Sequence, residues 1–114
     1  MATVHVRIEW PDGVEMPAAA RCRVTVENVS RLDAASTVVG ETVVEDLDPD
    51  APVDVEVDVP HVDDGSDLVV RVHVVDGARR GREVEAGDLL TTQSHPVLTR
   101  GRGSEVVVHP RRIG

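Results

Sequence analysis

One segment near the middle of the chain alternates without exception between valine and an acidic residue. From Val53 to Val59, a valine stands at every second position, and Asp54, Glu56 and Asp58 stand between them. Successive side chains of a β-strand point to opposite faces, so this order separates all the valines from all the carboxylates. A helix would scatter the acids around its circumference. The segment therefore predicts a half-buried strand.

The same period of two recurs along the whole chain of 114 residues, a length typical of one globular domain. Its 25 valines outnumber six leucines, two isoleucines and one tryptophan. β-Branched side chains favour strands because they are stiff at χ1 and pack well on a pleated surface. Turn-rich segments separate seven predicted strands, over residues 3–10, 21–28, 37–45, 53–59, 68–75, 88–93 and 105–109. We therefore expect an all-β fold, a seven-stranded antiparallel β-sandwich, as a single domain over residues 1–114.

Three residue patterns predict details of the core. Trp10 ends the first alternation on the valine face, so we expect it to be the largest single contributor to the core. Cys22 alternates with valines on the second strand, which indicates a buried structural thiol. Val69 and Val75 place apolar side chains on the second face of the fifth strand, so we expect that strand to be covered on both sides.

The chain is acidic, with 21 acids, 12 bases and a formal net charge of −9. All the bases are arginine; residues 41–67 carry eleven acids and no base, and residues 79–112 carry seven arginines. A net negative protein repels phosphate backbones and anionic lipid surfaces, which argues against a nucleic-acid partner. No apolar run approaches the roughly 18 residues that span a bilayer. We therefore expect no membrane span.

The search for catalytic residues yields two weak candidates. Ser30 with Asp33, and Ser94 beside His95, place a hydroxyl near an acid or a base. Neither pair has the strand-turn-helix context or the third partner that orients a catalytic base. Phosphate-loop and dinucleotide motifs do not occur in the sequence. We therefore expect no enzyme and no cofactor.

The histidines and the acidic loops contain the candidate metal ligands of the chain. The five histidines show no pair at chelate spacing, although His5 and His73 would meet across strands on one outward face. Asp46, Asp48 and Asp50 match the first three oxygen positions of a calcium loop. The glycine and the bidentate glutamate that such a loop needs are missing, so no metal-binding residues are assigned.

Two motifs in a fixed order carry a family resemblance. Met16 to Ala20, Met-Pro-Ala-Ala-Ala, leads into a strand that ends in Asn-Val-Ser-Arg-Leu-Asp-Ala at residues 28–34. About 70 residues later, Pro-Val-Leu-Thr-Arg-Gly at residues 96–101 precedes the last valine strand. In both motifs, and over nearly the whole chain, the sequence resembles the YbaY/YscW family of type III secretion lipoprotein chaperones and YbaY-like lipoproteins.

The resemblance implies a small, non-catalytic β-sandwich from a bacterium. Family members are typically exported outer-membrane lipoproteins, and some are pilotins that help a secretin ring assemble. The start of this chain shows neither the signal peptide nor the lipobox cysteine of that pattern. We therefore expect either a trimmed chain or a member without a lipid anchor.

Two classes of function follow from these observations. The first is a protein-binding or assembly module of the pilotin kind, with an unidentified partner that adds to a strand edge or binds the Ser30–Ser36 loop. The candidate contact residues are Ser30, Arg31, Asp33 and Arg100. Self-association through the same edge would give a homodimer. The alternative is a small-ligand-binding sandwich that holds a metal or a carbohydrate in its acidic loops.

Overall fold

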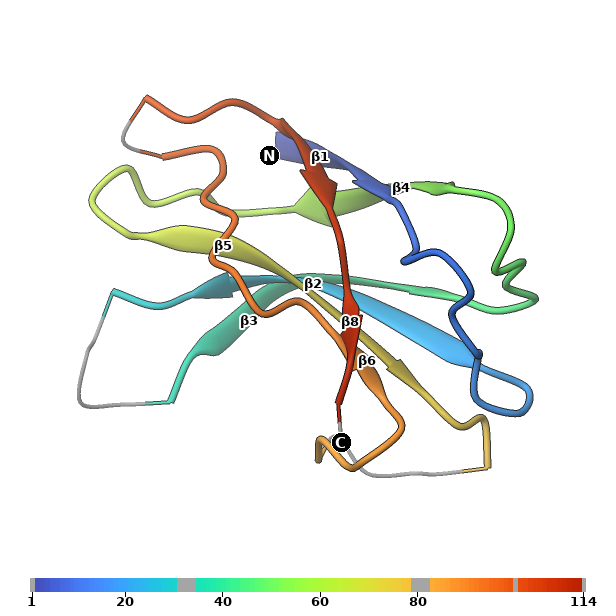
Figure 1. Ribbon diagram of the computed structural model, residues 1–114. Helices are drawn as coiled ribbons and strands as arrows, with labels where there is room; N and C mark the ends of the chain where they lie inside the picture. The colour runs from blue at the N-terminus through green and yellow to red at the C-terminus, as the bar shows by residue number, and fades with distance from the viewer. Residues whose placement is uncertain (1, 31–34, 79–82, 100, 114) are drawn as a thin grey trace.

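The computed structural model describes residues 2–30, 35–78, 83–99 and 101–113 (Figure 1). These residues form eight β-strands and contain no helix. Accordingly, the described segments include no helix with the length and apolar character needed to cross a membrane. The strands are β1 (Ala2–Ile8), β2 (Arg21–Asn28), β3 (Thr37–Val44), β4 (Val53–Val59), β5 (Leu68–Val75), β6 (Leu89–Leu90), β7 (Glu105–Val108) and β8 (Arg111–Arg112).

The strands form two sheets that lie one above the other (Figure 1). The upper sheet has the order β4-β1-β7, and the lower sheet has the order β3-β2-β5-β6-β8. The prediction of an all-β, two-sheet fold is confirmed. The prediction of seven strands, all antiparallel, is wrong in two respects: the described residues form eight strands, and β7 pairs with β1 in parallel.

Both differences arise near the end of the chain, where one continuous segment contributes β7 to the upper sheet and β8 to the lower sheet. β7 ends at Val108, and the chain passes through His109 and Pro110 into β8 at the edge of the lower sheet (Figure 1). Proline has no N–H to donate, which suits Pro110 to the gap between two ladders. The predicted strand over residues 88–93 contracts to β6, because the Thr91 hydroxyl replaces a backbone acceptor for the N–H of Val72 at 3.2 Å.

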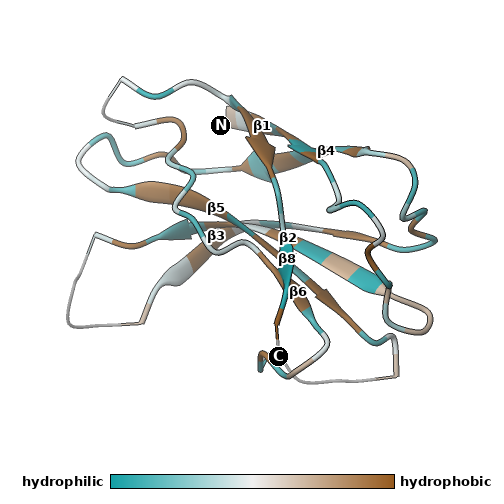
Figure 2. Ribbon diagram, viewed as in Figure 1, coloured by the Kyte–Doolittle hydropathy of each residue, from teal (hydrophilic) through white to brown (hydrophobic). Residues whose placement is uncertain are grey.

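The inward faces of the two sheets meet in one apolar cluster. Brown and teal alternate along β2 in Figure 2, as the period-two pattern predicts. The cluster is built almost entirely from short branched side chains, so the layers interlock without aromatic rings. Its buried members are Val4, Val6, Ile8, Ala20, Cys22, Val24, Val26, Val55, Val57, Val59, Leu68, Val70, Val72, Val74, Leu89, Val97 and Val108.

Two expectations about the lower sheet are confirmed. Cys22 has no exposed surface and lies in the core. β5 is covered on both faces, since Val72 and Val74 are buried on the inner face and His73 and Val75 on the outer one. β5 is therefore the central strand of the lower sheet, paired with β2 on one side and β6 on the other.

The expectation that Trp10 dominates the core is wrong. β1 ends at Ile8, and the bond from Glu9 N to Val108 O, 3.0 Å, is the last contact of its ladder with β7. Pro11 follows Trp10 and restricts the residue before it to an extended backbone that turns away from the sheet. Trp10 is therefore only partly buried and packs on the margin of the core.

Gly40 allows the two sheets to touch at one edge. A Cβ atom at this position would lie 2.6 Å from the Asp58 carbonyl oxygen of β4, closer than side chains approach backbone. Beside it, the Thr42 hydroxyl donates to the Glu56 carbonyl at 2.7 Å. The register of β3 against β2 shifts at this point, between Val26 and Glu27, which marks a β-bulge. The inner face of β3 therefore covers the outer edge of β4.

We expect the substitution Gly40→Ala to lower the free energy of unfolding by about 1–3 kcal/mol, because the added methyl group must displace β4 backbone. Gly103→Ala is the matched control, since a Cβ atom there meets nothing within 4 Å. Urea unfolding of both variants measures the difference. Equal stability of the two variants would show that the sheets do not touch at Gly40.

The thiol of Cys22 is expected to be unreactive in the folded protein. Burial raises its pKa to about 12, so the reactive thiolate is scarce at a pH near 8.5, where a free cysteine is about half ionised. A thiol-specific chromogenic reagent should label Cys22 only after unfolding in guanidinium chloride. Rapid labelling without denaturant would contradict the packing described for β2.

Candidate protein-binding surface

The outer strands of the two sheets differ in how much backbone they leave open. β4 is covered by the inner face of β3, as the contacts of Gly40 and Thr42 show. Of the remaining outer strands, β8 spans two residues, β7 four and β3 eight. In the part of the chain that the structure describes, β3 therefore presents the longest open strand edge.

β3 directs the backbone groups of Glu41 and Val43 away from its neighbour. The bond from Val29 N to Asp67 O, 2.9 Å, shows that odd-numbered residues of β2 bond β5. Before the bulge, the even-numbered residues of β2 therefore bond the even-numbered residues of β3. The N–H and C=O groups of Glu41 and Val43 consequently point outward, where no described strand pairs with β3.

Two exposed valines lie along this edge. Val38 is 46% exposed and Val43 is 44% exposed, although both belong to a paired strand. Both stand on the outer face of the sheet, opposite Glu27 and Arg23 of β2. Apolar side chains beside an unpaired backbone are the features that an added strand uses. We name β3 and these two valines the β3 edge.

Side chains of β2 form polar contacts with β3 and with Ser36 just before it. Glu27 is nearly fully buried, and its carboxylate accepts hydrogen bonds from the Thr25 hydroxyl at 2.6 Å and from the Ser36 hydroxyl at 2.5 Å. Ser36 directly precedes β3, so this carboxylate fastens the start of β3 to β2. Farther along, Arg23 Nε lies 3.8 Å from the Glu41 carboxylate. These side-chain contacts tie β3 to β2 in addition to the backbone ladder.

Of the four contact residues predicted from the sequence, Ser30 is the one that lies among the described residues. Its hydroxyl lies 2.5 Å from Asn28 Oδ1 and accepts a bond from Asp67 N at 2.7 Å, while its own N–H donates to Asn28 Oδ1. Ser30 therefore ties the end of β2 to the start of β5. Arg31, Asp33 and Arg100 lie outside the described residues.

Sequence reasoning did not single out Val38 and Val43, although a signal was present. The doublets Val38-Val39 and Val43-Val44 break the alternation and place valine on both faces of β3. An apolar residue on each face of a strand indicates that both faces are covered. Here the outer face is open at Val38 and Val43.

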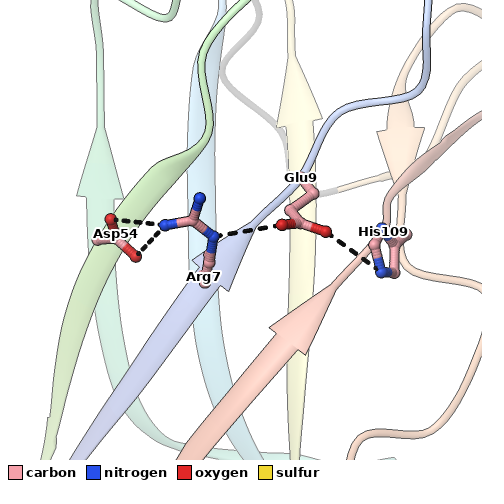
Figure 3. A network of polar contacts seen from close by, with 4 residues as sticks. All are labelled: Arg7, Glu9, Asp54 and His109. Carbon is pink, nitrogen blue, oxygen red and sulfur yellow. Dashed lines mark hydrogen bonds and ion pairs between the residues drawn. The ribbon is translucent and has the colours of Figure 1, made fainter.

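The outer face of the upper sheet carries a row of exposed charges (Figure 3). Arg7 of β1 pairs with Asp54 of β4 at 3.3 Å and with Glu9 at 3.2 Å, and Glu9 lies 3.8 Å from His109. Exposed ion pairs of this kind are screened by solvent and contribute little to stability. The row is therefore a solvated face whose charges largely satisfy each other.

His73 belongs to a buried pair that the sequence did not predict. Its Nε2 atom lies 2.8 Å from Asp88 Oδ2, and both side chains are almost fully buried. Asp88 also accepts the N–H of Ile113 through its carbonyl, at 2.8 Å, so the pair helps to anchor β8. The expected meeting of His73 with His5 is wrong, because β1 and β5 belong to different sheets. His5 instead lies 3.4 Å from Glu56 on the upper sheet.

The carboxylates of two acidic loops cap their own turns. Asp48 Oδ1 accepts the N–H of Asp50 at 2.8 Å, and Asp63 Oδ1 accepts that of Gly65 at 3.0 Å. Such local bonds are typical of Asx turns. Among the residues that the structure describes, three or more His, Cys, Asp or Glu side chains nowhere gather as a metal site requires.

Comparisons with known proteins agree with this fold. The comparison with curated proteins finds no match. Among solved structures, an alternative pilotin from the type II secretion system of Vibrio cholerae superposes with a TM-score of 0.73 at 14% identity, over 99% of this chain and 97% of that one. At this identity the likeness shows a shared fold. The sequence also matches the family described as type III secretion system lipoprotein chaperone (YscW) over residues 1–109. A match of that extent shows that the chain belongs to the YscW family of type III secretion system lipoprotein chaperones.

Proposed function

We propose that this protein is a pilotin-like chaperone that binds an extended segment of a client protein at the β3 edge. Membership of the YscW family supports a non-catalytic, protein-binding role in secretion. The likeness in fold to a pilotin supports the same role. The observation that carries the choice of surface is the open, eight-residue β3 strand, with outward backbone groups at Glu41 and Val43. A secretin subunit is the client that the family suggests.

Strand addition would use both features of the β3 edge. The outward N–H and C=O groups supply main-chain hydrogen bonds, which give affinity with little dependence on the client sequence. Val38 and Val43 supply apolar contacts for alternate side chains of the client, which give selectivity. The preferred client segment therefore alternates apolar and polar residues, as the strands of this protein do.

The rigidity of β3 favours such binding. Its start is fastened through Ser36 and Glu27, and its middle rests on β4 through Gly40 and Thr42. A strand already held in its bound conformation loses little entropy when a partner adds to it. The bulge beside Val26 twists this edge, which discourages pairing between copies of the protein. These features favour a client segment over a homodimer.

The alternative of a small ligand in the acidic loops is not favoured by any contact. The carboxylates of Asp48 and Asp63 are engaged in their own turns. We therefore propose protein binding alone.

The test uses overlapping synthetic peptides that cover the outer-membrane secretion proteins encoded in the same genome, the secretin first. We expect a peptide with alternating apolar residues to bind the full chain and to protect the amides of Glu41 and Val43 from hydrogen exchange. The double substitution Val38→Lys, Val43→Lys should weaken binding at least about tenfold, because lysine at a strand edge opposes pairing.

Val107→Lys is the matched control, because Val107 is 47% exposed on β7 of the other sheet. Its affinity for the peptide should stay at the wild-type value. If the lysine substitutions in β3 leave affinity unchanged, the binding surface lies elsewhere. If none of the peptides binds, the proposed chaperone function is wrong.

A further inference from the structure

The β-bulge in β3 sets the spacing of the two exposed valines of the β3 edge. Val38 and Val43 are five positions apart on β3, whereas the residues opposite to them on β2, Glu27 and Arg23, are four positions apart. β3 therefore fits one extra residue into the same length of sheet, as a bulged strand does. Both valines are nearly half exposed, so this spacing is presented to solvent.

Val39 is the extra residue. The pairing with β2 passes from Gly40 directly to Val38, so no residue of β2 stands opposite Val39. The Val39 side chain packs against the core. In a regular strand, residues five positions apart point to opposite faces. The bulge instead places Val38 on the outer face of the sheet, together with Val43.

A client strand that adds to β3 meets the same spacing from the open side. A regular strand rises about 3.3 Å per residue, so the four positions that β2 uses correspond to about 13 Å. Two client side chains therefore face Val38 and Val43 together when they are four positions apart. At five positions one of them turns to the other face of the sheet. At six positions both return to one face but lie about 20 Å apart, which is too far.

The outer face of β3 carries Glu41 between the two valines. β2 places Thr25 opposite to it, and the Glu41 carboxylate lies 3.8 Å from Arg23 Nε on the β2 side. On the open side, a client carboxylate opposite Glu41 would set two like charges directly across from each other, which is destabilising. The middle position of the client is therefore polar and not acidic, as Thr25 is on β2.

We propose that the β3 edge selects client segments with two β-branched apolar residues four positions apart and a polar, non-acidic residue midway between them. This inference rests on the proposed function and specifies its client. The outward backbone groups of Glu41 and Val43 accept any extended segment, whereas the spacing of the valines fixes the register. Inserting one residue between the two apolar positions of the client moves one of them to the wrong face.

Three acetylated and amidated peptides test the spacing. Gly-Val-Ser-Thr-Ser-Val-Gly places its valines four positions apart, Gly-Val-Ser-Thr-Thr-Ser-Val-Gly five, and Gly-Val-Ser-Thr-Ser-Thr-Ser-Val-Gly six. Each reads the same in both directions, so the result does not depend on the orientation of the added strand. Each is titrated into the isotope-labelled full chain, with the amide NMR signals of Glu41 and Val43 as reporters. We expect the first peptide to bind at least about tenfold more tightly than the other two.

A substitution in the protein shows whether both valines are read. Val38→Thr replaces one methyl group of an exposed side chain by a hydroxyl, which leaves a single valine for the peptide to match. The three peptides should then bind with nearly equal affinity. Val107→Thr is the matched control, because Val107 is 47% exposed on β7 of the other sheet, and it should keep the preference for the first peptide.

The possible outcomes separate this inference from the proposed function. Equal affinities of the three peptides for the wild type, or a preference that survives Val38→Thr, would overturn the spacing and leave strand addition at β3 intact. If none of the three binds while a secretin peptide does, the spacing is also wrong. If neither set of peptides binds, the proposed function fails together with the spacing.

Discussion

The close contact between the two valine layers is the constraint on which the rest of the structure depends. Short branched side chains fill a thin seam, and no aromatic ring stands among the fully buried residues. A thin seam brings backbone from one sheet against backbone from the other, which only glycine permits at Gly40. At that contact β3 covers β4, so one sheet edge is closed without any additional strand.

Most of the fold follows from the alternation of residues, because burial of one face dictates side-chain order along each strand. The strands over residues 53–59 and 68–75, the buried thiol of Cys22 and the central place of β5 were all predictable in this way. The parallel pairing of β1 with β7 was not, because alternation specifies faces and says nothing of neighbours. The burial of Trp10 was mispredicted for a related reason. The alternation of apolar and polar residues continues to Trp10, whereas β1 ends at Ile8.

The candidate surface was harder to predict than the fold. Whether a strand lies at an edge depends on the order of strands in the sheet, which is set by pairings between segments of the chain and not by the residues of one strand. Ser30 was singled out from a motif, and its hydroxyl accepts the N–H of Asp67, which ties the end of β2 to the start of β5. The valine doublets of β3 were visible in the sequence, but they identify a docking surface only when the strand is known to lack a second neighbour.

The outer strands of this protein differ in how well they suit pairing with a second copy of the chain. β4 is covered, and β8 is too short to template a strand. Among the described strands, β3 is the long and open one, yet its bulge makes it a poor match for another copy of itself. An edge that disfavours its own copy suits the proposed addition of a client strand, because self-pairing would cover the surface that the client must reach.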